Sequence, residues 1–586
     1  MTAIFGYLGV HDGSLPRRMG DLLAHRGSGH ATLDIRGGGF VGARGTTPGD
    51  RIKRDGLITL AAQATMYDVP GTSAEFTSRL VALVHAGPQS FDTLDADFAL
   101  VAVHDDGTVT LARDFFGCAP LYFTQTMGGI AFATEYKALL HVPEFTATPD
   151  SDMLQHLQHG KRLPLGRTLL KGVEAVLPGT VLTIAPDGAR TVRLMPTITA
   201  TGELSDETVA CELVRTSLVR ALTRRTADLD TIGLALSGGI DSIALAFMIH
   251  ELWPAKRLVT VCSGSSPEDR ECVTARAVAE AVGSEHHEVI TPPGDLSIER
   301  MRELVWHLED PYSRSEALQL AEVGRQAAQS GCKVVLSAQG ADGLFAGMPK
   351  YELLRLMQKH PMMRRGLKEF WTYTQLGLSP RSALGRLGVL AKFRGAIPPV
   401  PRVKGSDYRP EPPTFPEHGP QFINRAMSRG FQAGVCQDIQ KFERGFAAHG
   451  VEYRSPFYDL RFVHDAYSID DALKLKDGQE KWIFRRALSA WVPAEFLDIP
   501  KFPQRLDAGR ALADALDQLM AETKPGSGEE DVFEPGTVDR LMRRTRGKPY
   551  VYEAAMRLWM VILSRLWAEQ LTRSGTPDRM EAMEHG

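Results

Sequence analysis

Short apolar runs separated by Gly, Asp and Pro clusters fill the first 200 residues of the chain. They lie at 4–10, 57–62, 98–104, 108–112, 121–123 and 181–184. Runs of this length, bounded by turn-forming residues, predict β-strands, and a succession of them indicates an antiparallel, layered domain. The pattern lapses between residues 195 and 204. We therefore expect a first domain over 1–200 that ends in a linker.

The next part of the chain alternates strand-like and helix-like segments. Ser205-Asp206-Glu207 predicts a helix start. Strands are predicted at 232–236, 258–262, 287–290 and 333–337, with helices between them. Such alternation predicts a parallel sheet covered by helices on both faces, with ligands bound at the carboxyl ends of its strands. We expect this second domain over 201–575, and a frayed tail over 576–586.

The most informative segment is Ser237-Gly238-Gly239-Ile240-Asp241-Ser242, which joins a predicted strand to a predicted helix. Two adjacent glycines let the backbone approach a ligand closely, and the start of a helix adds a partial positive charge. Phosphate is the natural anion for such a turn. The loop lacks the lysine of a Walker loop and offers Asp241 instead, and a carboxylate beside phosphates predicts a shared magnesium ion.

Composition indicates the kinds of partner and the cellular compartment to expect. The net charge of −4 over 586 residues identifies no nucleic-acid or membrane partner. The six cysteines are scattered without a Cys-x-x-Cys pair, which favours reduced thiols in a cytoplasm. The N-terminus has no basic flank typical of a signal peptide. The apolar stretch 551–571 contains Glu553, Arg557 and Arg565, so a core helix is expected there, and we predict a cytoplasmic protein.

Two further features have ordinary interpretations. Residues 350–409 hold thirteen Lys or Arg against three acids and grade into a Pro-rich stretch, so 350–415 is expected to be an excursion. It is either a solvated amphipathic segment or a basic arm for a polyanionic or peptide partner. His286-His287 lacks a third metal ligand at helical spacing, which favours a strand-end pair over a metal site. Cys262 and Cys272 are predicted to be core thiols.

An ordered set of segments resembles the asparagine synthetase-like family over nearly the whole chain. Beyond the loop at 237–242, the matching segments are Ala275-Arg276-Ala277, Glu285-His286-His287-Glu288-Val289, Trp306-His307-Leu308-Glu309-Asp310-Pro311, residues 335–347 (VLSAQGADGLFAG), residues 450–459 (GVEYRSPFYD), Lys481-Trp482-Ile483-Phe484-Arg485, Val492-Pro493 and Pro500-Lys501. The resemblance implies a Rossmann-like synthetase domain with a pyrophosphate-binding (PP) loop.

The N-terminal part resembles the glutamine-hydrolysing domain of the same family. The segments that carry this are His25-Arg26-Gly27, Ala112-Arg113-Asp114, Pro120-Leu121-Tyr122 and residues 132–140 (FATEYKALL). The resemblance implies an N-terminal-nucleophile (Ntn) hydrolase-type αββα sandwich. Glutaminase members begin Met-Cys-Gly-Ile and use the cysteine, whereas this chain begins Met1-Thr2-Ala3-Ile4. A threonine can be a nucleophile, but its hydroxyl is far less acidic than a thiol, so we predict a degenerate domain that acts as a scaffold.

The resemblance also implies chemistry. A substrate carboxylate would attack the α-phosphorus of ATP, pyrophosphate would leave, and an acyl-adenylate would remain. Asp241 and Asp342 would hold Mg²⁺ between the phosphates. Taken alone, Gly340-Ala341-Asp342-Gly343 favours a plain turn, whereas its pairing with the loop at 237–242 favours a metal ligand. The predicted nucleotide-binding residues are Leu236, Ser237, Gly238, Gly239, Asp241, Ser242 and Gly340.

Three residues are predicted to be catalytic. Lys501 follows Pro500 where the family carries a lysine facing the adenylate, and a fixed cation there stabilises negative charge. Lys481 is a second candidate, and a solvated helix face is its alternative interpretation. Glu443 lies near where β-lactam-forming relatives place a base-orienting glutamate, although helix surfaces often carry glutamates.

Because the cysteine that attacks glutamine in glutaminase members is missing, the source of the amine that attacks the adenylate becomes the question. Family branches without it resemble β-lactam synthetases, carbapenam synthetases and lasso-peptide cyclases, which close a ring within one molecule. The β-lactam branch has a tyrosine where this chain has Gln339, which cannot act as a general base. We therefore predict a lasso-type cyclase acting on a precursor peptide, with a leader-binding protein or peptidase as further partners. The alternatives are an ammonia-dependent asparagine synthetase or amidotransferase, β-lactam-type ring closure, and a non-catalytic scaffold.

Overall fold

A computed structural model defines the fold. It describes residues 1–68, 71–292, 295–311, 316–359, 399–410, 419–499, 510–525, 530–545 and 552–574. Lys501 and most of the basic segment predicted at 350–415 lie outside these residues. None of the described helices is long and apolar enough to cross a membrane.

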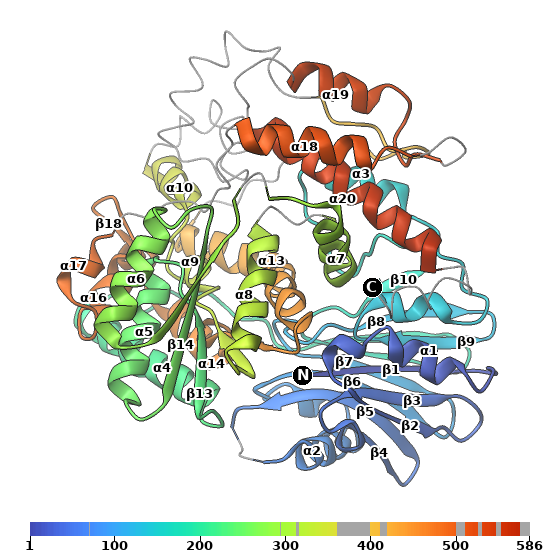
Figure 1. Cartoon of the computed structure of the whole chain (residues 1–586). Coiled ribbons are helices and arrows are strands. Elements are labelled where there is room, and N and C mark those ends of the chain that lie inside the picture. Colours follow the sequence, from blue (N-terminus) through green and yellow to red (C-terminus); the bar gives the residue numbers. More distant parts are fainter. Residues whose placement is uncertain are drawn as a thin grey trace.

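The N-terminal part forms two antiparallel sheets (Figure 1, blue and cyan). Its strands are β1 (Thr2–Leu8), β2 (Gly29–Asp34), β3 (Phe40–Gly45), β4 (Ile52–Asp55), β5 (Ile58–Met66), β6 (Ala96–His104), β7 (Val109–Arg113), β8 (Tyr122–Thr126), β9 (Gly129–Ala133), β10 (Val173–Ala175), β11 (Thr180–Ile184) and β12 (Arg190–Leu194). The sheet orders are β10-β8-β9-β1-β3-β2 and β12-β11-β7-β6-β5-β4.

Strand alternation explains why these sheets form four layers. In β1, Ile4 faces the core shared with the second sheet, whereas Phe5 lies in the core under α1 (Leu15–Asp21). On the other sheet, Leu60 packs beneath α2 (Ser73–Ala86). The outer face of each sheet is apolar and a helix covers it, so both faces of each sheet are buried. The predicted αββα sandwich is confirmed.

The second part forms a parallel sheet in the order β15-β14-β13-β16-β17 (Figure 1, green). Its strands are β13 (Thr231–Ala235), β14 (Arg257–Gly264), β15 (Glu285–Ile290), β16 (Val334–Leu336) and β17 (Glu452–Arg454). The helices around it include α4 (Glu207–Thr226), α5 (Ile240–Leu252), α6 (Arg270–Val282), α8 (Glu316–Gln329) and α13 (Phe422–Ala447). The predicted parallel sheet is confirmed, and β17 is a further strand that the sequence pattern did not predict.

Shorter elements frame the ends of this sheet. They are α7 (Ile298–Leu308), α9 (Ala341–Leu344), α10 (Pro349–Lys359), α14 (Leu460–Ser468), α15 (Asp471–Lys474), β18 (Leu475–Lys476), β19 (Gln479–Glu480), α16 (Trp482–Leu488) and α17 (Ala494–Leu497). In the first part of the chain, α3 (Ser151–Gln158) lies between β9 and β10.

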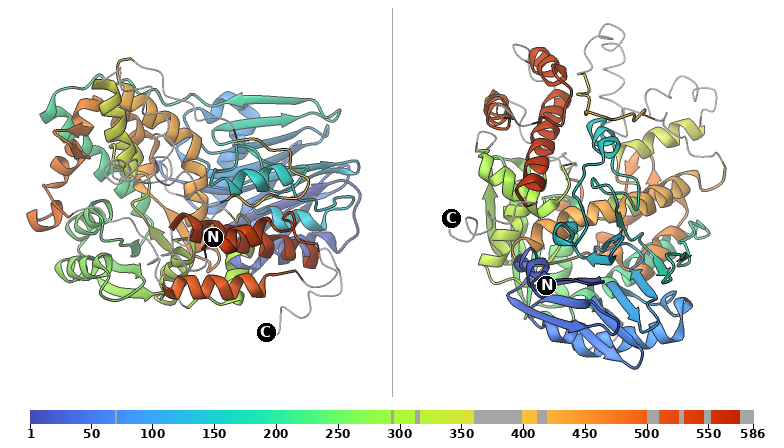
Figure 2. Two further views of the ribbon diagram at one scale, coloured as in Figure 1. Left: turned by 90° about the horizontal axis from the view of Figure 1, so that it is seen from above. Right: turned by 90° about the vertical axis from the view of Figure 1, so that its right-hand side faces the viewer.

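The C-terminal helices return to the N-terminal part of the chain. They are α18 (Arg510–Glu522), α19 (Thr537–Thr545) and α20 (Tyr552–Ser574), and Figure 2 shows them gathered together (red). Leu558 and Trp559 of α20 are buried in the same core as Phe5 of β1. The Trp567 indole N–H donates to the Tyr136 hydroxyl at 2.9 Å. The apolar stretch at 551–571 is therefore a core helix, and its packing ties the end of the chain to the beginning.

Candidate active site

The loop from Ser237 to Ser242 joins β13 to α5 at the carboxyl end of the parallel sheet. Gly238 has a φ of +67°, and a Cβ there would lie 2.7 Å from the Glu271 carbonyl oxygen, so only glycine fits. The Ser242 hydroxyl accepts from the Ser237 N–H at 3.1 Å and donates to the Gly239 carbonyl at 3.0 Å. These bonds fold the loop tightly around the start of α5.

The start of α5 has the properties of an anion site. Gly239 is its N-cap and supplies no side-chain hydrogen bond to the first turn. The N–H groups of that turn therefore face the loop together with the positive end of the helix dipole. Most of α5 is buried, which fixes its axis toward the loop. The arrangement fits a bound phosphate or pyrophosphate.

Lys481 brings together the two carboxylates predicted to hold magnesium. Its Nζ lies 2.5 Å from Asp241 Oδ2 and 2.5 Å from Asp342 Oδ1. The lysine side chain is 3% exposed, so this cation is shared by the two carboxylates away from bulk water. Burial alone would lower the pKa of Lys481, but Asp241 and Asp342 outweigh it and raise the pKa. The lysine stays charged, and the solvated helix face considered for it is excluded.

Backbone turns position this trio. Asp342 lies in the first turn of α9, just after β16, and Gly340 before it has a φ of +111°. Lys481 itself has a φ of +57° at the start of α16. A Cβ on Gly347 would lie 2.0 Å from Lys481 Cε and 2.3 Å from Asp342 Oδ1. Gly347 therefore leaves the space that the lysine occupies.

The carboxylates of Asp241 and Asp342 also fit a magnesium ion. Both offer oxygen, which is the ligand that Mg²⁺ prefers, and both converge on the position of a single cation beside an anion-binding loop. The turn interpretation of Asp342 explains its backbone but not this convergence. The structure thus brings together Leu236, Ser237, Gly238, Gly239, Asp241, Ser242, Gly340, Asp342 and Lys481.

Glu443 departs from its predicted place. It lies in α13, where its Oε1 and Oε2 accept from Arg26 Nη1 and Nη2 at 2.5 and 3.0 Å. Arg26 belongs to the N-terminal sandwich, so this pair is a contact between the two halves of the chain. The assignment of Glu443 as a base-orienting residue is corrected, because both of its oxygens are held by a buried guanidinium.

Arg26 and Glu443 are part of a larger buried ionic network. Arg444 Nη1 lies 2.5 Å from Glu309 and 3.3 Å from Glu135, and Arg26 also contacts Glu135. All of these side chains are almost inaccessible to solvent. Burial opposes the charge on Arg444, but Glu309 and Glu135 raise its pKa well above the ordinary value. Arg444 therefore stays charged, and the network joins the two halves.

Thr2 begins β1 at the boundary between the halves. It is 6% exposed and lies opposite Gly45 in the register. The Met1 amino group is buried near Glu452 and Arg51, and burial lowers its pKa. The residue that stands in place of the family's cysteine is therefore packed into the strand.

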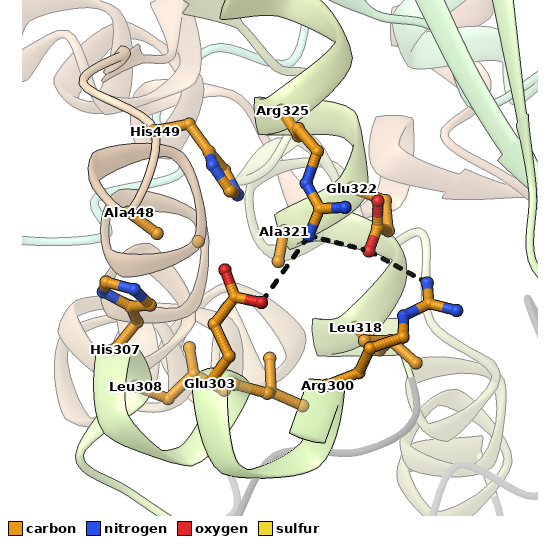
Figure 3. A pocket seen from close by; sticks show the side chains of 12 residues that line it. Arg300, Glu303, His307, Leu308, Leu318, Ala321, Glu322, Arg325, Ala448 and His449 are labelled. Carbon is orange, nitrogen blue, oxygen red and sulfur yellow. Dashed lines mark hydrogen bonds and ion pairs between the residues drawn. The ribbon is translucent and has the colours of Figure 1, made fainter. Parts of the chain in front are cut away.

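A pocket between α7, α8 and the end of α13 offers a contrast with this site (Figure 3). Its charges pair with one another. Glu322 lies 2.9 Å from Arg300 and 3.3 Å from Arg325, and Arg325 also lies 3.7 Å from Glu303. Because its charged groups are mutually satisfied, the pocket lacks the convergent polar groups of a catalytic site.

The two halves of the chain match known families. Residues 72–194 match the glutamine amidotransferase domain model. Residues 213–569 match the asparagine synthase model. An Ntn-type domain followed by a parallel-sheet synthetase domain defines the class. The chain belongs to the asparagine synthase family, whose members are ATP-dependent ligases.

Three curated relatives illustrate the family. A putative glutamine-hydrolysing asparagine synthetase of Mycobacterium tuberculosis is 29% identical over 82% of this chain and 78% of its own length. Glutamine-hydrolysing asparagine synthetase 1 of Bacillus subtilis is 27% identical over 67% of this chain and 64% of its own length, just under two thirds. The carboxyethyl-arginine beta-lactam-synthase of Streptomyces clavuligerus is 28% identical over 77% of this chain and 72% of its own length.

Some residues that shape the site had no predicted role. Gly347 ends the segment at 335–347, and its place beside Lys481 explains why that segment closes with a glycine. Arg26 and Glu135 lie in segments quoted for the family resemblance, and Arg444 lies in none. Two charged residues, Glu135 and Lys137, within a largely apolar segment were the available signal for Glu135. Its partners come from distant segments, so the sequence did not identify the network.

Proposed function

We propose that this protein is an ATP-dependent, AMP-forming amide-bond synthetase. The observation that carries the proposal is the Lys481 ammonium, held 2.5 Å from both Asp241 and Asp342 beside the Ser237–Ser242 loop. A glycine turn at a helix start, two carboxylates and a buried cation form a site for the phosphates of ATP. The buried cation Arg444 joins the two halves of the chain, whereas Lys481 lies beside a glycine turn at a helix start, and this position favours an active site over a scaffold.

Each group has a part in the first step. A substrate carboxylate oxygen attacks the α-phosphorus, and the bond from that phosphorus to the oxygen bridging to the β-phosphate breaks. The N–H groups of the loop donate to the departing pyrophosphate, and Lys481 offsets its developing charge. Asp241 and Asp342 would hold Mg²⁺, which supplies further charge neutralisation when bound.

In the second step an amine attacks the acyl carbon of the adenylate. A new C–N bond forms, AMP leaves with the electrons of the C–O bond, and the amine gives up a proton. We propose that the amine and the carboxylate belong to one molecule, a lasso-type precursor peptide whose N-terminal amine closes a macrolactam on an Asp or Glu side chain. An amine held close to the adenylate needs little help from a base.

Three observations support a source of amine other than glutamine. Thr2 stands where glutaminase members carry cysteine. Gln339, beside Gly340, offers an amide and no general base. One relative is named a beta-lactam-synthase. In a cytoplasmic pathway of this kind, a leader-binding protein or a peptidase would act alongside.

A second candidate is an ammonia-dependent asparagine synthetase, which the names of other relatives favour. A third is β-lactam-type ring closure on a small substrate. All three share the adenylation step and differ in the carboxylate that is activated and in the amine that attacks it. The choice among them is therefore an experiment on substrates.

ATP–pyrophosphate exchange tests the shared step, and product mass tests the amine. We expect exchange stimulated by a precursor peptide encoded beside the gene and lost in Asp241→Ala. The peptide should lose one water only with ATP and Mg²⁺. Exchange stimulated by aspartate, with ammonia-dependent release of asparagine, would establish the second candidate. No exchange with any carboxylate, and no effect of Asp241→Ala, would overturn the synthetase itself.

A further inference from the structure

Four chemically reactive side chains gather on one face of the parallel sheet. In the β14–β15 register, Thr260 lies opposite His286 and Cys262 lies opposite Glu288. Because alternate residues of a strand share a face, all four side chains point to the same side. Helix α6 lies beside β14 and covers that side (Figure 1). The sequence predicts a core thiol and a strand-end histidine here, and the register places them together.

The distances suit a shared ligand. His286 Nε2 lies 3.8 Å from Cys262 Sγ and 3.7 Å from Glu288 Oε1, and the three ligand atoms lie within 4.8 Å of one another. His286 Nδ1 bonds the Thr260 hydroxyl at 2.9 Å. That bond orients the ring with Nε2 toward the other ligands, as partners of metal-bound histidines do.

Cys272 supplies a fourth atom. It lies in the first turn of α6, fully buried, within hydrogen-bonding reach of Cys262. A Cβ on Gly264 would lie 2.5 Å from Cys272 Sγ, so the glycine that ends β14 makes room for this sulfur. Both thiols are buried. His286 and Glu288 lie on the edge strand β15 with side chains 12% and 20% exposed, which leaves an entry path for a cation.

We propose that Cys262, Cys272, His286 and Glu288 form a binding site for a divalent zinc-class cation. Zinc bonds of about 2.0–2.3 Å in a tetrahedron place neighbouring ligand atoms roughly 3.3–3.8 Å apart. His286 Nε2 already lies 3.8 Å from Cys262 Sγ and 3.7 Å from Glu288 Oε1, and Cys272 would complete the set by moving toward them. Two thiolates and a carboxylate balance the cation together with Arg276, which lies 2.7 Å from Glu288. Sulfur and imidazole ligands favour Zn²⁺ over Mg²⁺.

A second group of three potential ligands, Asp97, Asp114 and Cys118, serves as a comparison. Asp114 already accepts backbone N–H groups from Phe116, Cys118 and Ala119 at 2.9–3.0 Å. Its oxygens shape a turn of the backbone. In the Cys262–His286 cluster, Glu288 pairs with the Arg276 side chain, which can move aside, and the sulfur of Cys262 faces the nitrogen of His286.

The proposed cation would act close to the phosphate loop. Glu271 precedes Cys272, and its backbone packs against Gly238 so closely that a Cβ on that glycine would lie 2.7 Å from the Glu271 carbonyl oxygen. A metal bound to Cys272 would fix the first turn of α6, which contacts the loop. The site is structural in kind and does not depend on which amine the enzyme uses.

Metal binding is tested on the full-length protein, purified with a phosphine reductant and titrated with Co²⁺ as the probe. We expect a thiolate-to-cobalt absorption band with the intensity of tetrahedral coordination, displaced by Zn²⁺ at one equivalent per chain. Cys262→Ser and Cys272→Ser should each weaken Co²⁺ binding by at least about tenfold. The matched control is Cys332→Ser, a buried cysteine elsewhere in the same core, which should leave the band unchanged.

His286→Gln is the second variant, because its partly exposed ring can change without emptying the core. It should keep the native unfolding transition and weaken Co²⁺ binding. Absence of the band in the reduced wild-type protein would overturn the proposal. Equal bands in the wild type and in Cys262→Ser, or a Cys262–Cys272 disulfide that persists under reductant, would overturn it as well.

Discussion

The two positions at which this family carries out chemistry differ sharply. At the parallel sheet, Asp241 and Asp342 converge on the Lys481 ammonium beside the glycine loop. At the N-terminal sandwich, Thr2 replaces the family's cysteine and is packed into β1. One position combines two carboxylates with a buried cation, and the other has a threonine where the family's glutaminase members carry cysteine.

The contact between the halves is nevertheless intact. Arg26, Glu135, Glu309 and Arg444 remain buried and paired with one another, and such groups are costly to bury unless all are paired. The sandwich also shares a core with α20. The difference teaches that the contacts between the two domains do not depend on a cysteine at position 2.

The largest expected effect comes from breaking that contact. Arg444→Met leaves Glu135 and Glu309 without their shared cation, and should lower the free energy of unfolding by about 3–5 kcal/mol. Urea unfolding followed by circular dichroism measures it. Arg429→Met, an exposed arginine on the same helix, is the matched control and should change it by less than about 0.5 kcal/mol. Equal stability of the two variants would show that the network does not hold the halves together.

The next effect is on chemistry. Lys481→Met removes the cation beside the phosphate loop and should slow ATP–pyrophosphate exchange by about 10²–10³-fold, the usual cost of losing one charge-stabilising group. Lys476→Met is the control, because that lysine pairs with Glu207 at the surface. An exchange rate within about twofold of wild type would remove Lys481 from the mechanism.

A smaller effect should follow from crowding the same lysine. Gly347→Ala adds a Cβ at 2.0 Å from Lys481 Cε, and the flexible lysine can retreat only by leaving its carboxylates. We expect exchange to fall roughly tenfold with the unfolding midpoint unchanged. Gly430→Ala has open space around the new Cβ and should behave as wild type. Loss of the folded state in Gly347→Ala would mean that Gly347 is required for packing and does not mainly make room for Lys481.

Much of this organisation could be predicted from the sequence. Strands and helices follow from local apolar periodicity, and the loop at 237–242 was recognisable because all its residues are contiguous. The Arg26–Glu443 pair spans 417 positions, and no local pattern joins such partners. The Cys262–His286 cluster depends on the register of β14 against β15, which exists only once the sheet is formed. The sequence predicted Lys481 as a catalytic candidate, but only the folded structure shows the two carboxylates that it contacts.

The smallest expected effect comes from changing Thr2, which stands where the family's glutaminase members carry cysteine. Thr2→Ala removes a hydroxyl and a methyl group from a residue that is 6% exposed, and should leave ATP–pyrophosphate exchange within about twofold of wild type. Neither protein should release ammonia from glutamine, measured by a coupled dehydrogenase assay. Thr2→Cys is the sharper variant, because a thiol is the nucleophile that glutaminase relatives use. If glutamine hydrolysis appears in Thr2→Cys, the rest of the glutaminase site is preserved; if it is present in wild type and abolished in Thr2→Ala, threonine itself is the nucleophile and the comparison fails.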